Sequence, residues 1–369
     1  MLRLSLVLVV VALAGRAAAF EPTGNIVADA MLKTLDAAGF SGARAEVERV
    51  ADSVILKNPR ATGFAAESII VDSGSIDADN ALNAAAITYR TVSIAGAGGA
   101  VSSAETVTLS GVKLSGTGTQ TGVARLLGDF SGIALTNVSA RSAAGEAISL
   151  SRLAASGTRA DGVMDGALSV EGLVFDLSLF DEPAAGQIRA LGFDRLTVGL
   201  AAEGAWQPDG RANLRTAALG VDGMGTLTLS GAAVGLTASS IAKLQASAAE
   251  FSEVLEVLGA VSLRALTVSF EDDGLTKALL TAAVGRTGQS EGAVTAALLA
   301  AARPAIAELG DTAFAADVEA ALTAFMTTPG RLTVRAMPTS DVTALQVIGA
   351  AMVNRALIPD LLALTITHE

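Results

Sequence analysis

The sequence predicts an α+β fold rich in β-structure: a long, curved antiparallel sheet of short strands, with one N-terminal helix and several C-terminal helices. Three observations predict this fold. Apolar residues recur at helical spacing over residues 26–35, alternate with polar residues from residue 43 to about residue 236, and then return to helical spacing. Gly, Ser, Asn and Asp interrupt the alternating part, as they do where turns join antiparallel strands.

The N-terminal segment has the pattern of a signal peptide. Arg3 supplies a positive charge, residues 4–14 form a short apolar run, and Ala17 to Ala19 give a small-residue cleavage pattern. We therefore expect residues 1–19 to be a signal peptide, cut between Ala19 and Phe20, and the protein to be soluble in the periplasm. An extracellular location and an uncleaved anchor are the alternatives. No later apolar run predicts a transmembrane segment.

The remaining chain divides by pattern, without a linker, into residues 20–236 and residues 237–369. In the first part Thr23 is the expected N-cap of a helix that stops at Gly39, and Asn58-Pro59 is expected to end the first strand run. Further strands are predicted at residues 69–71, 87–94, 107–114, 133–138, 148–153, 168–179, 196–200, 214–221 and 227–236. Turns are predicted at residues 207–210 and 222–223.

The second part is predicted to mix helices and strands, and to continue the same body. Ser247 and Asp311 have the residue types of N-caps. Helices are expected near residues 251–258, 275–284, 291–309, 312–326 and 341–355, with strands at 261–270, 331–337 and 364–367.

Composition removes most catalytic chemistries. The chain has no cysteine and one histidine, His368, so thiol catalysis, disulfides and cysteine metal sites are excluded. The net charge of −12 comes without a Lys/Arg cluster, so we expect no nucleic-acid partner. Two Ser-x-x-Lys strings occur, at residues 110–113 and 240–243, without the other elements of a serine–lysine site. The sequence predicts no catalytic residue, no cofactor and no metal, and a non-enzymatic protein; an exported hydrolase that relies on carboxylates is the minor alternative.

Two polar segments remain. Residues 72–80 resemble a calcium loop, but Leu82 and Thr88 stand where that loop needs glycine and glutamate, so an ordinary turn is the better interpretation. Glu271, Asp272 and Asp273 precede a predicted helix, where carboxylates accept bonds from free backbone N–H groups. We expect a capping role for them in preference to metal binding or catalysis.

The alternating strands predict one dry and one wet sheet face. Three helices cannot cover a dry face about 50 Å wide, because each covers about 10 Å. We therefore predict that this face binds a lipid or another hydrophobic molecule; the alternative is a structural or interaction protein of the periplasm whose core is closed. The oligomeric state stays open, with a monomer expected. The candidate ligand face consists of Val107, Leu109, Leu168, Val170, Leu196, Val198, Leu227 and Leu229.

Three sequence segments in the second half of the chain carry a family resemblance: residues 196–200 with 206–210, residues 266–275, and residues 329–334. Over residues 195–369 they resemble uncharacterised exported proteins of Gram-negative bacteria. In its many short predicted strands the chain also resembles the periplasmic parts of AsmA-like and YdgA-like envelope proteins, although it is shorter and shows no retained membrane anchor. This resemblance implies envelope maintenance or lipid handling along a hydrophobic groove.

We predict that the exported protein begins at Phe20, because the apolar run is too short to span a bilayer and is followed by a cleavage pattern. Intact mass and N-terminal sequencing of the periplasmic fraction measure this. Recovery of a chain that still carries residues 1–19 in the membrane fraction would contradict it.

Overall fold

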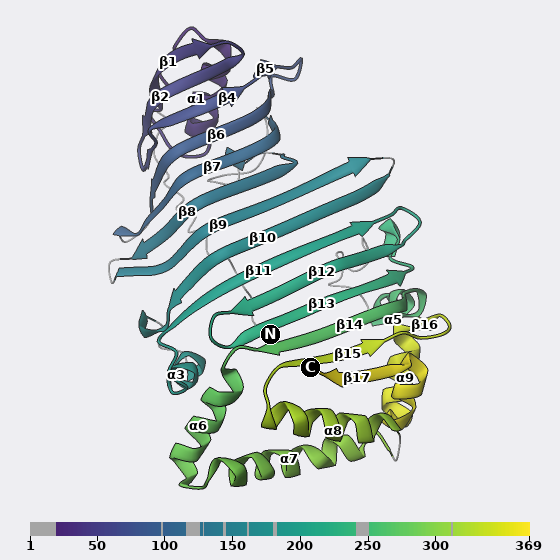
Figure 1. Ribbon diagram of the computed structural model, residues 1–369. Helices are drawn as coiled ribbons and strands as arrows, with labels where there is room; N and C mark the ends of the chain where they lie inside the picture. The colour runs from purple at the N-terminus through teal and green to yellow at the C-terminus, as the bar shows by residue number, and fades with distance from the viewer. Residues whose placement is uncertain are drawn as a thin grey trace. The chain divides into compact units, whose positions relative to one another are not determined.

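The computed structural model describes residues 20–96, 99–115, 126–127, 129–142, 145–160, 162–179, 183–240, 251–310 and 313–369. The 17 strands of these residues belong to one antiparallel sheet, with a helix before them and several helices after most of them (Figure 1). The predicted fold class is confirmed.

The strands are β1 (Arg44–Val50), β2 (Ser53–Ala61), β3 (Phe64–Ala65), β4 (Ser68–Asp72), β5 (Ser75–Ile76), β6 (Leu82–Ala95), β7 (Val101–Leu114), β8 (Gly132–Ser142), β9 (Gly145–Ala160), β10 (Val163–Asp176), β11 (Arg195–Trp206), β12 (Ala212–Val221), β13 (Gly225–Val234), β14 (Ser262–Asp272), β15 (Arg331–Ala336), β16 (Val342–Thr343) and β17 (Leu364–His368). The helices are α1 (Ile26–Ala37), α3 (Pro183–Arg189), α5 (Phe251–Ala260), α6 (Leu275–Thr287), α7 (Glu291–Ala307), α8 (Ala313–Thr327), α9 (Ala344–Val353) and α10 (Ile358–Leu362), with the short 3-10 helices η2 (Leu177–Leu179) and η3 (Arg355–Leu357).

The chain forms two compact units. Unit 1 comprises Met1–Gly157 and Ser169–Leu179, and unit 2 comprises Thr158–Leu168 and Phe180–Glu369. The boundary predicted at residue 236 therefore falls inside unit 2.

Helix α1 supplies one layer of the core of unit 1. Its N-cap is Asn25, whose Oδ1 accepts bonds from the backbone N–H groups of Val27 and Ala28 at 3.0 and 3.2 Å. Thr23, the expected cap, instead donates its hydroxyl to Asp29 at 2.7 Å. Asparagine and threonine both cap helices, and Asn25, which lies nearer the first helical turn, is the N-cap. The helix packs on β1, β2, β5 and β6 through the fully buried side chains of Met31, Leu32 and Leu35.

The other layer of this core is the apolar face of the sheet in unit 1. The ladder places Leu56 of β2 opposite Ile69 of β4, and Ile87 of β6 opposite Leu109 of β7. Side chains of directly opposed residues lie on the same sheet face. All four have 0% exposure, so α1 and the sheet enclose a complete core. Burial of each such side chain contributes about 1.5–3 kcal/mol.

The strands are longer than the short runs that the sequence pattern predicts. β9 has 16 residues, and β6, β7 and β10 have 14 each. The expectation that Asn58-Pro59 ends the first run is also wrong, because β2 continues through both residues to Ala61. Asn58 adopts a φ of 46°, which asparagine tolerates better than most residues, and the register shift between Arg44 and Glu46 absorbs the irregularity.

Both predicted turns of unit 2 are present. Gly210, at a φ of 89°, donates to the carbonyl of Gln207 at 2.9 Å and joins β11 to β12. Gly223, at a φ of 72°, lies in the turn between β12 and β13. The expected caps Ser247 and Asp311 lie outside the described residues. The acidic cluster behaves as predicted at Asp272, whose Oδ1 accepts the Thr276 N–H at 2.9 Å in the first turn of α6.

We predict that Leu109→Ala lowers the free energy of unfolding by about 2–5 kcal/mol, because it leaves a cavity in a closed core. Val101→Ala is the matched control on the same strand, where the side chain is 41% exposed, and it should cost less than about 1 kcal/mol. Urea unfolding followed by circular dichroism measures both. Equal losses for the two variants would show that unit 1 lacks the closed core described.

Candidate functional site

Strands β11, β12 and β13 of unit 2 carry a continuous apolar face. The ladder places Val198 opposite Val221 and Leu200 opposite Leu219. Leu219 is in turn opposite Leu227. Because opposed residues share a face and alternate residues of a strand share it too, six side chains lie together. We call them the open sheet face: Val198, Leu200, Leu219, Val221, Leu227 and Leu229.

The same apolar face continues into β14, β15 and β17, where helices cover it. Phe270 of β14 lies opposite Leu227, and its ring centroid is 6.2 Å from that of Phe325 on α8. Phe325 also packs edge-on against His368, at 6.0 Å. Figure 1 shows α8 running beside β17. At the other end of these strands a small cluster around Ala336, Val342 and Leu362 packs with α9 and α10: Leu263, Leu266, Val347, Ile358, Leu361 and Leu364.

On β11 to β13 the corresponding side chains remain partly or largely accessible. Leu219 is 42% exposed and Leu227 is 45% exposed; they oppose each other two residue pairs from the end of the β12–β13 ladder. The only buried residue of these three strands is Gly225, which has no side chain. Within the described part of unit 2, the apolar face is therefore open on β11 to β13.

The reverse face is polar on β13, β14 and β15. Thr226, Thr228 and Ser230 of β13 oppose Glu271, Ser269 and Thr267 of β14. Arg331 of β15 donates to Glu271 at 2.5 Å. One dry and one wet face were predicted from the alternation, and the register shows both in unit 2.

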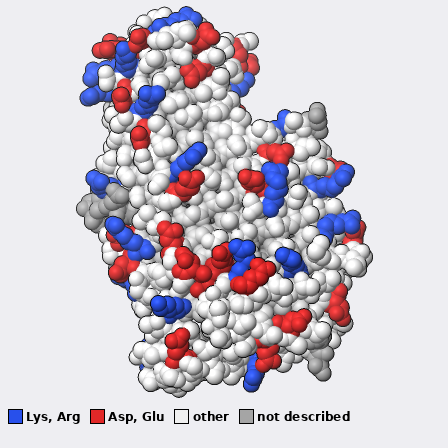
Figure 2. All heavy atoms as spheres, in the orientation of Figure 1, with Lys and Arg blue, Asp and Glu red and all other residues white. Residues whose placement is uncertain are grey.

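Several charged side chains outside the open sheet face form ion pairs. Arg215 lies 2.9 Å from Asp165 and 3.6 Å from Glu203, and Asp165 raises the pKa of Arg215 chiefly through the hydrogen bond between them. Figure 2 shows acidic and basic side chains intermixed over the visible surface.

The predicted ligand-face residues fall in different environments. Leu109 has 0% exposure in the closed core of unit 1, and Val107 packs against that core. Leu109 is therefore already enclosed by the protein and leaves no surface for a ligand in this structure. Val170 also belongs to unit 1 and is half-buried. The remaining five belong to unit 2, where Leu227 is exposed and the others are half-buried: Leu168, Leu196, Val198, Leu227 and Leu229.

Sequence reasoning missed Leu200, Leu219 and Val221, which complete the open sheet face. The signal was present, since Leu214 to Val221 alternates. It did not reveal the register, which pairs β12 centrally between β11 and β13.

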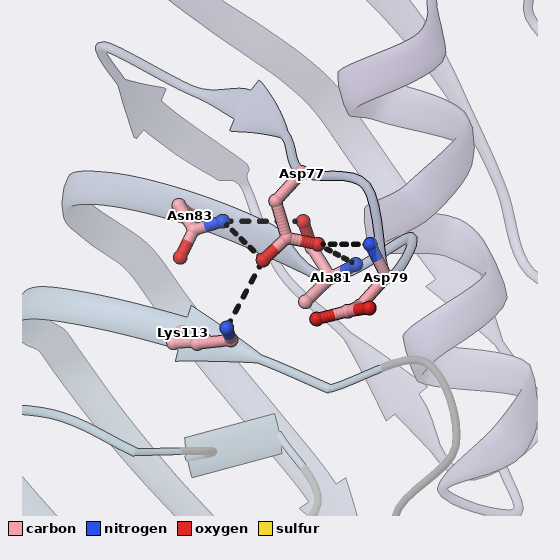
Figure 3. A network of polar contacts seen from close by, with 5 residues as sticks. All are labelled: Asp77, Asp79, Ala81, Asn83 and Lys113. Atoms are coloured by element: carbon pink, nitrogen blue, oxygen red, sulfur yellow. Dashed lines mark hydrogen bonds and ion pairs between the residues drawn. The ribbon is translucent and has the colours of Figure 1, made fainter.

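The calcium-like segment is a turn organised by one carboxylate (Figure 3). Asp77 Oδ1 accepts the backbone N–H groups of Asp79 and Ala81, both at 2.9 Å. Its Oδ2 accepts the Asn83 amide at 3.1 Å and lies 3.0 Å from Lys113 Nζ. These donors, with the Ala81 N–H contributing most, hold the pKa of Asp77 far below its usual range. Both oxygens are already engaged by the protein, as in the ordinary turn that the sequence predicts.

The Ser-x-x-Lys strings and the histidine have structural contacts. Lys113 bonds Asp77, which raises the lysine pKa and keeps it protonated. Ser240 is buried and donates to the carbonyl of Gly235 at 3.2 Å, whereas Lys243 lies outside the described residues. His368 Nε2 lies 2.9 Å from the carbonyl oxygen of Thr328. Lys113, Ser240 and His368 thus each contact a backbone or side-chain group of the protein.

Comparison with protein families gives one match. A family model described as "Uncharacterized protein" matches residues 218–369, from the end of β12 to the C-terminus. No curated protein matches the chain. The matched range includes Leu219, Leu227 and Leu229 of the open sheet face. The comparison agrees with the predicted resemblance to uncharacterised proteins in this half, and it lends no support to the AsmA-like resemblance.

In the part of the chain that the structure describes, no helix has both the length and the apolar character needed to cross a bilayer.

We predict that Asp77→Asn reduces the dependence of stability on acid pH. The depressed pKa of Asp77 means that its carboxylate stabilises the fold above its unfolded pKa of about 3.9, and that this contribution is lost as the pH falls toward the folded value. Thermal unfolding between about pH 6 and about pH 2 measures the slope. Asp79→Asn, which removes a carboxylate from the same turn but none of the four bonds to Asp77, should keep the wild-type slope. An unchanged slope in Asp77→Asn would contradict the assignment.

Proposed function

We propose that this protein is exported to the periplasm and binds a hydrophobic ligand, of the size of a lipid acyl chain, on the open sheet face. One observation carries the proposal: Leu219 and Leu227 oppose each other on the two central strands β12 and β13 of unit 2, next to the turn that joins them, and are 42% and 45% exposed. Exposed apolar patches of several hundred Å² are uncommon on soluble monomers and usually mark an interaction site.

The dimensions of the open sheet face suit a chain-like ligand. Three strands about 4.8 Å apart give a strip on the order of 10–15 Å wide, and ten residues of β13 extend about 33 Å. An acyl chain on such a strip would gain about 0.8 kcal/mol for each CH₂ group removed from water. The face offers only aliphatic side chains, so it would select by apolar area and not by hydrogen bonding.

The second candidate is a structural or interaction protein of the periplasm without a ligand. The closed core of unit 1 favours that interpretation for unit 1, because Leu56, Ile69, Ile87 and Leu109 have no exposed area there. In unit 2 the open sheet face favours ligand binding.

We predict that Leu227→Asp abolishes binding of a fluorescent fatty acid while the protein stays folded, because the side chain is 45% exposed and a charge there is hydrated in the free protein. Native mass spectrometry of protein purified from the periplasm and titration with the fatty-acid probe measure binding; circular dichroism measures folding.

Thr228→Asp is the matched control, on the next residue of β13 but on the polar face. It should bind the probe as the wild type does. Unfolding of Leu227→Asp would indicate a closed core in solution, and wild-type protein with no ligand and no affinity for the probe would favour the structural alternative.

A further inference from the structure

Trp206 is the only tryptophan of the chain, and it lies at one end of β11. Alternate residues of a strand share a sheet face, so Trp206 lies on the same face as Val198 and Leu200. The register shift between β11 and β12 skips Arg215 of β12 and leaves β11 regular. Trp206 is therefore on the apolar side of the sheet, at the end of β11 to β13 opposite the β12–β13 turn.

The indole of Trp206 reaches across the strip that β11, β12 and β13 form. Its Nε1 donates to the carbonyl oxygen of Leu236, just after β13, at 2.5 Å. β12 lies between β11 and β13 in the sheet, so the ring passes over the start of β12. Trp206 opposes Ala212, which opposes Ala233, and these two small side chains leave room for the ring. The indole, held by this hydrogen bond, therefore closes that end of the strip.

The side chains of β11 between the open sheet face and Trp206 are small. Only Ala202 and Gly204 separate Leu200 from Trp206 on this side of the strand. Glycine within a strand often marks a place where a ligand or another backbone approaches closely. Leu214 of β12 opposes Gly204 and flanks this path. A chain-like ligand that lies on Leu200 can therefore continue along β11 until it meets the indole.

Charged side chains are confined to the ends of the strip. At the β12–β13 turn Asp222 is exposed, and Asp273 accepts the Gly223 N–H at 3.3 Å. Lys277, in the first turns of α6, is exposed as well. Between this end and the indole the apolar side carries no charged residue: residues 198, 200, 202, 204 and 206 of β11, residues 212, 214, 217, 219 and 221 of β12, and residues 225, 227, 229, 231 and 233 of β13.

The tryptophan end of the strip offers a ligand no hydrogen bond from the ring. The Trp206 side chain is half-buried, and its single donor is already bonded to Leu236. In the turn beyond it Asp209 and Arg211 pair with each other at 2.6 Å. The accessible part of the indole is therefore carbon surface, which suits the methyl end of an amphiphile better than its head group.

We propose that Trp206 is the specificity-determining residue of the open sheet face: it stops the methyl end of a single acyl chain, whose polar head lies at the β12–β13 turn. This inference rests on the proposed function and adds an orientation and a length limit. The distance along β11 from Val198 to Trp206 is about 26 Å. Chains longer than this should gain nothing from their additional CH₂ groups, because the indole blocks the path.

The first test measures binding of monoacylglycerols with dodecanoyl, hexadecanoyl, eicosanoyl and tetracosanoyl chains, by displacement of the fluorescent fatty acid. Their uncharged head group keeps the acidic side chains of the turn from affecting the comparison. In the wild type the affinity should rise about fourfold for each CH₂ group and then level off before the longest chain. Trp206→Ala should bind the tetracosanoyl probe at least about tenfold more tightly than the wild type does.

Trp206→Phe is the matched control, because it keeps an aromatic wall without the bond to Leu236; it should keep the length limit. Circular dichroism measures folding of both variants. Identical chain-length profiles for the wild type and Trp206→Ala would overturn the role of Trp206, and loss of affinity for all four probes alike in Trp206→Ala would show a purely structural residue.

A second test needs no variant, because the fluorescence of the wild type comes from Trp206 alone among tryptophans. A hexadecanoyl or eicosanoyl probe with bromine on its last carbon should quench most of the Trp206 emission, whereas bromine beside the ester carbonyl should leave it unchanged. Equal quenching by the two probes, or stronger quenching by the second, would overturn the orientation. A wild type that binds none of the probes would contradict the proposed function itself, whereas binding without a length limit and without terminal quenching contradicts only this inference.

Discussion

An antiparallel sheet places every second side chain on one face, and this chain fills that face with Leu, Val and Ile. The rest of the structure depends on how much of this apolar face the helices cover. In unit 1, α1 covers it and buries Leu56, Ile69, Ile87 and Leu109 completely. In unit 2, α8 covers the end near Phe270, and α9 with α10 covers the end near Leu266. Among the described residues nothing covers β11 to β13 to the same extent, since Leu219 and Leu227 keep exposed fractions of 42% and 45%. The same alternation therefore produces a core in one place and an accessible surface in another.

Backbone hydrogen bonding explains how β11 to β13 can remain ordered with little buried apolar area. β11 and β12 pair over nine residues of each strand, and β13 pairs with β14 over ten. Hydrogen bonds also connect the turns at either end of these strands to neighbouring segments. Trp206 Nε1 donates to the carbonyl of Leu236 at 2.5 Å, and Leu236 N donates to Gly210. At the opposite end, Asp273 accepts the Gly223 N–H at 3.3 Å. These contacts join the turns to neighbouring segments without any layer of side chains over the strands.

The spacing of apolar residues along the sequence is sufficient to predict the helices and strands and their order. In a strand, the alternation of apolar and polar residues shows which face of the sheet is apolar. It could not distinguish Leu109 from Leu227: both are leucines at alternating positions of long strands, and they differ only in whether a distant helix lies over them. Local chemistry had a similar limit. Thr23 and Asn25 are both good caps, and among the acidic residues Asp272 rather than Asp273 bonds the first turn of α6, while Asp273 bonds the β12–β13 turn. Sequence spacing shows which residues are suitable, but the entry angle of the chain decides which one is used. The strands were predicted too short because Gly, Ser and Asn, which often mark turns, here sit within strands, as Asn58 does in a bulge.

The open sheet face follows from one compositional fact. The chain is 51% hydrophobic but only 4% aromatic, so its helices carry many alanines and few side chains large enough to fill a wide interface. Where a large ring is available, as at Phe325, the covering helix is anchored to the sheet and the face beneath it closes. Where only Ala, Gly and single aliphatic residues are available, as on the outer side of α9, the apolar surface stays accessible. A substitution that removes Leu219 or Leu227 should then cost folding little, since neither is buried. The opposed leucines contribute to the sheet through their cross-strand contact, and the exposed part of both side chains is the surface on which the proposed ligand would lie.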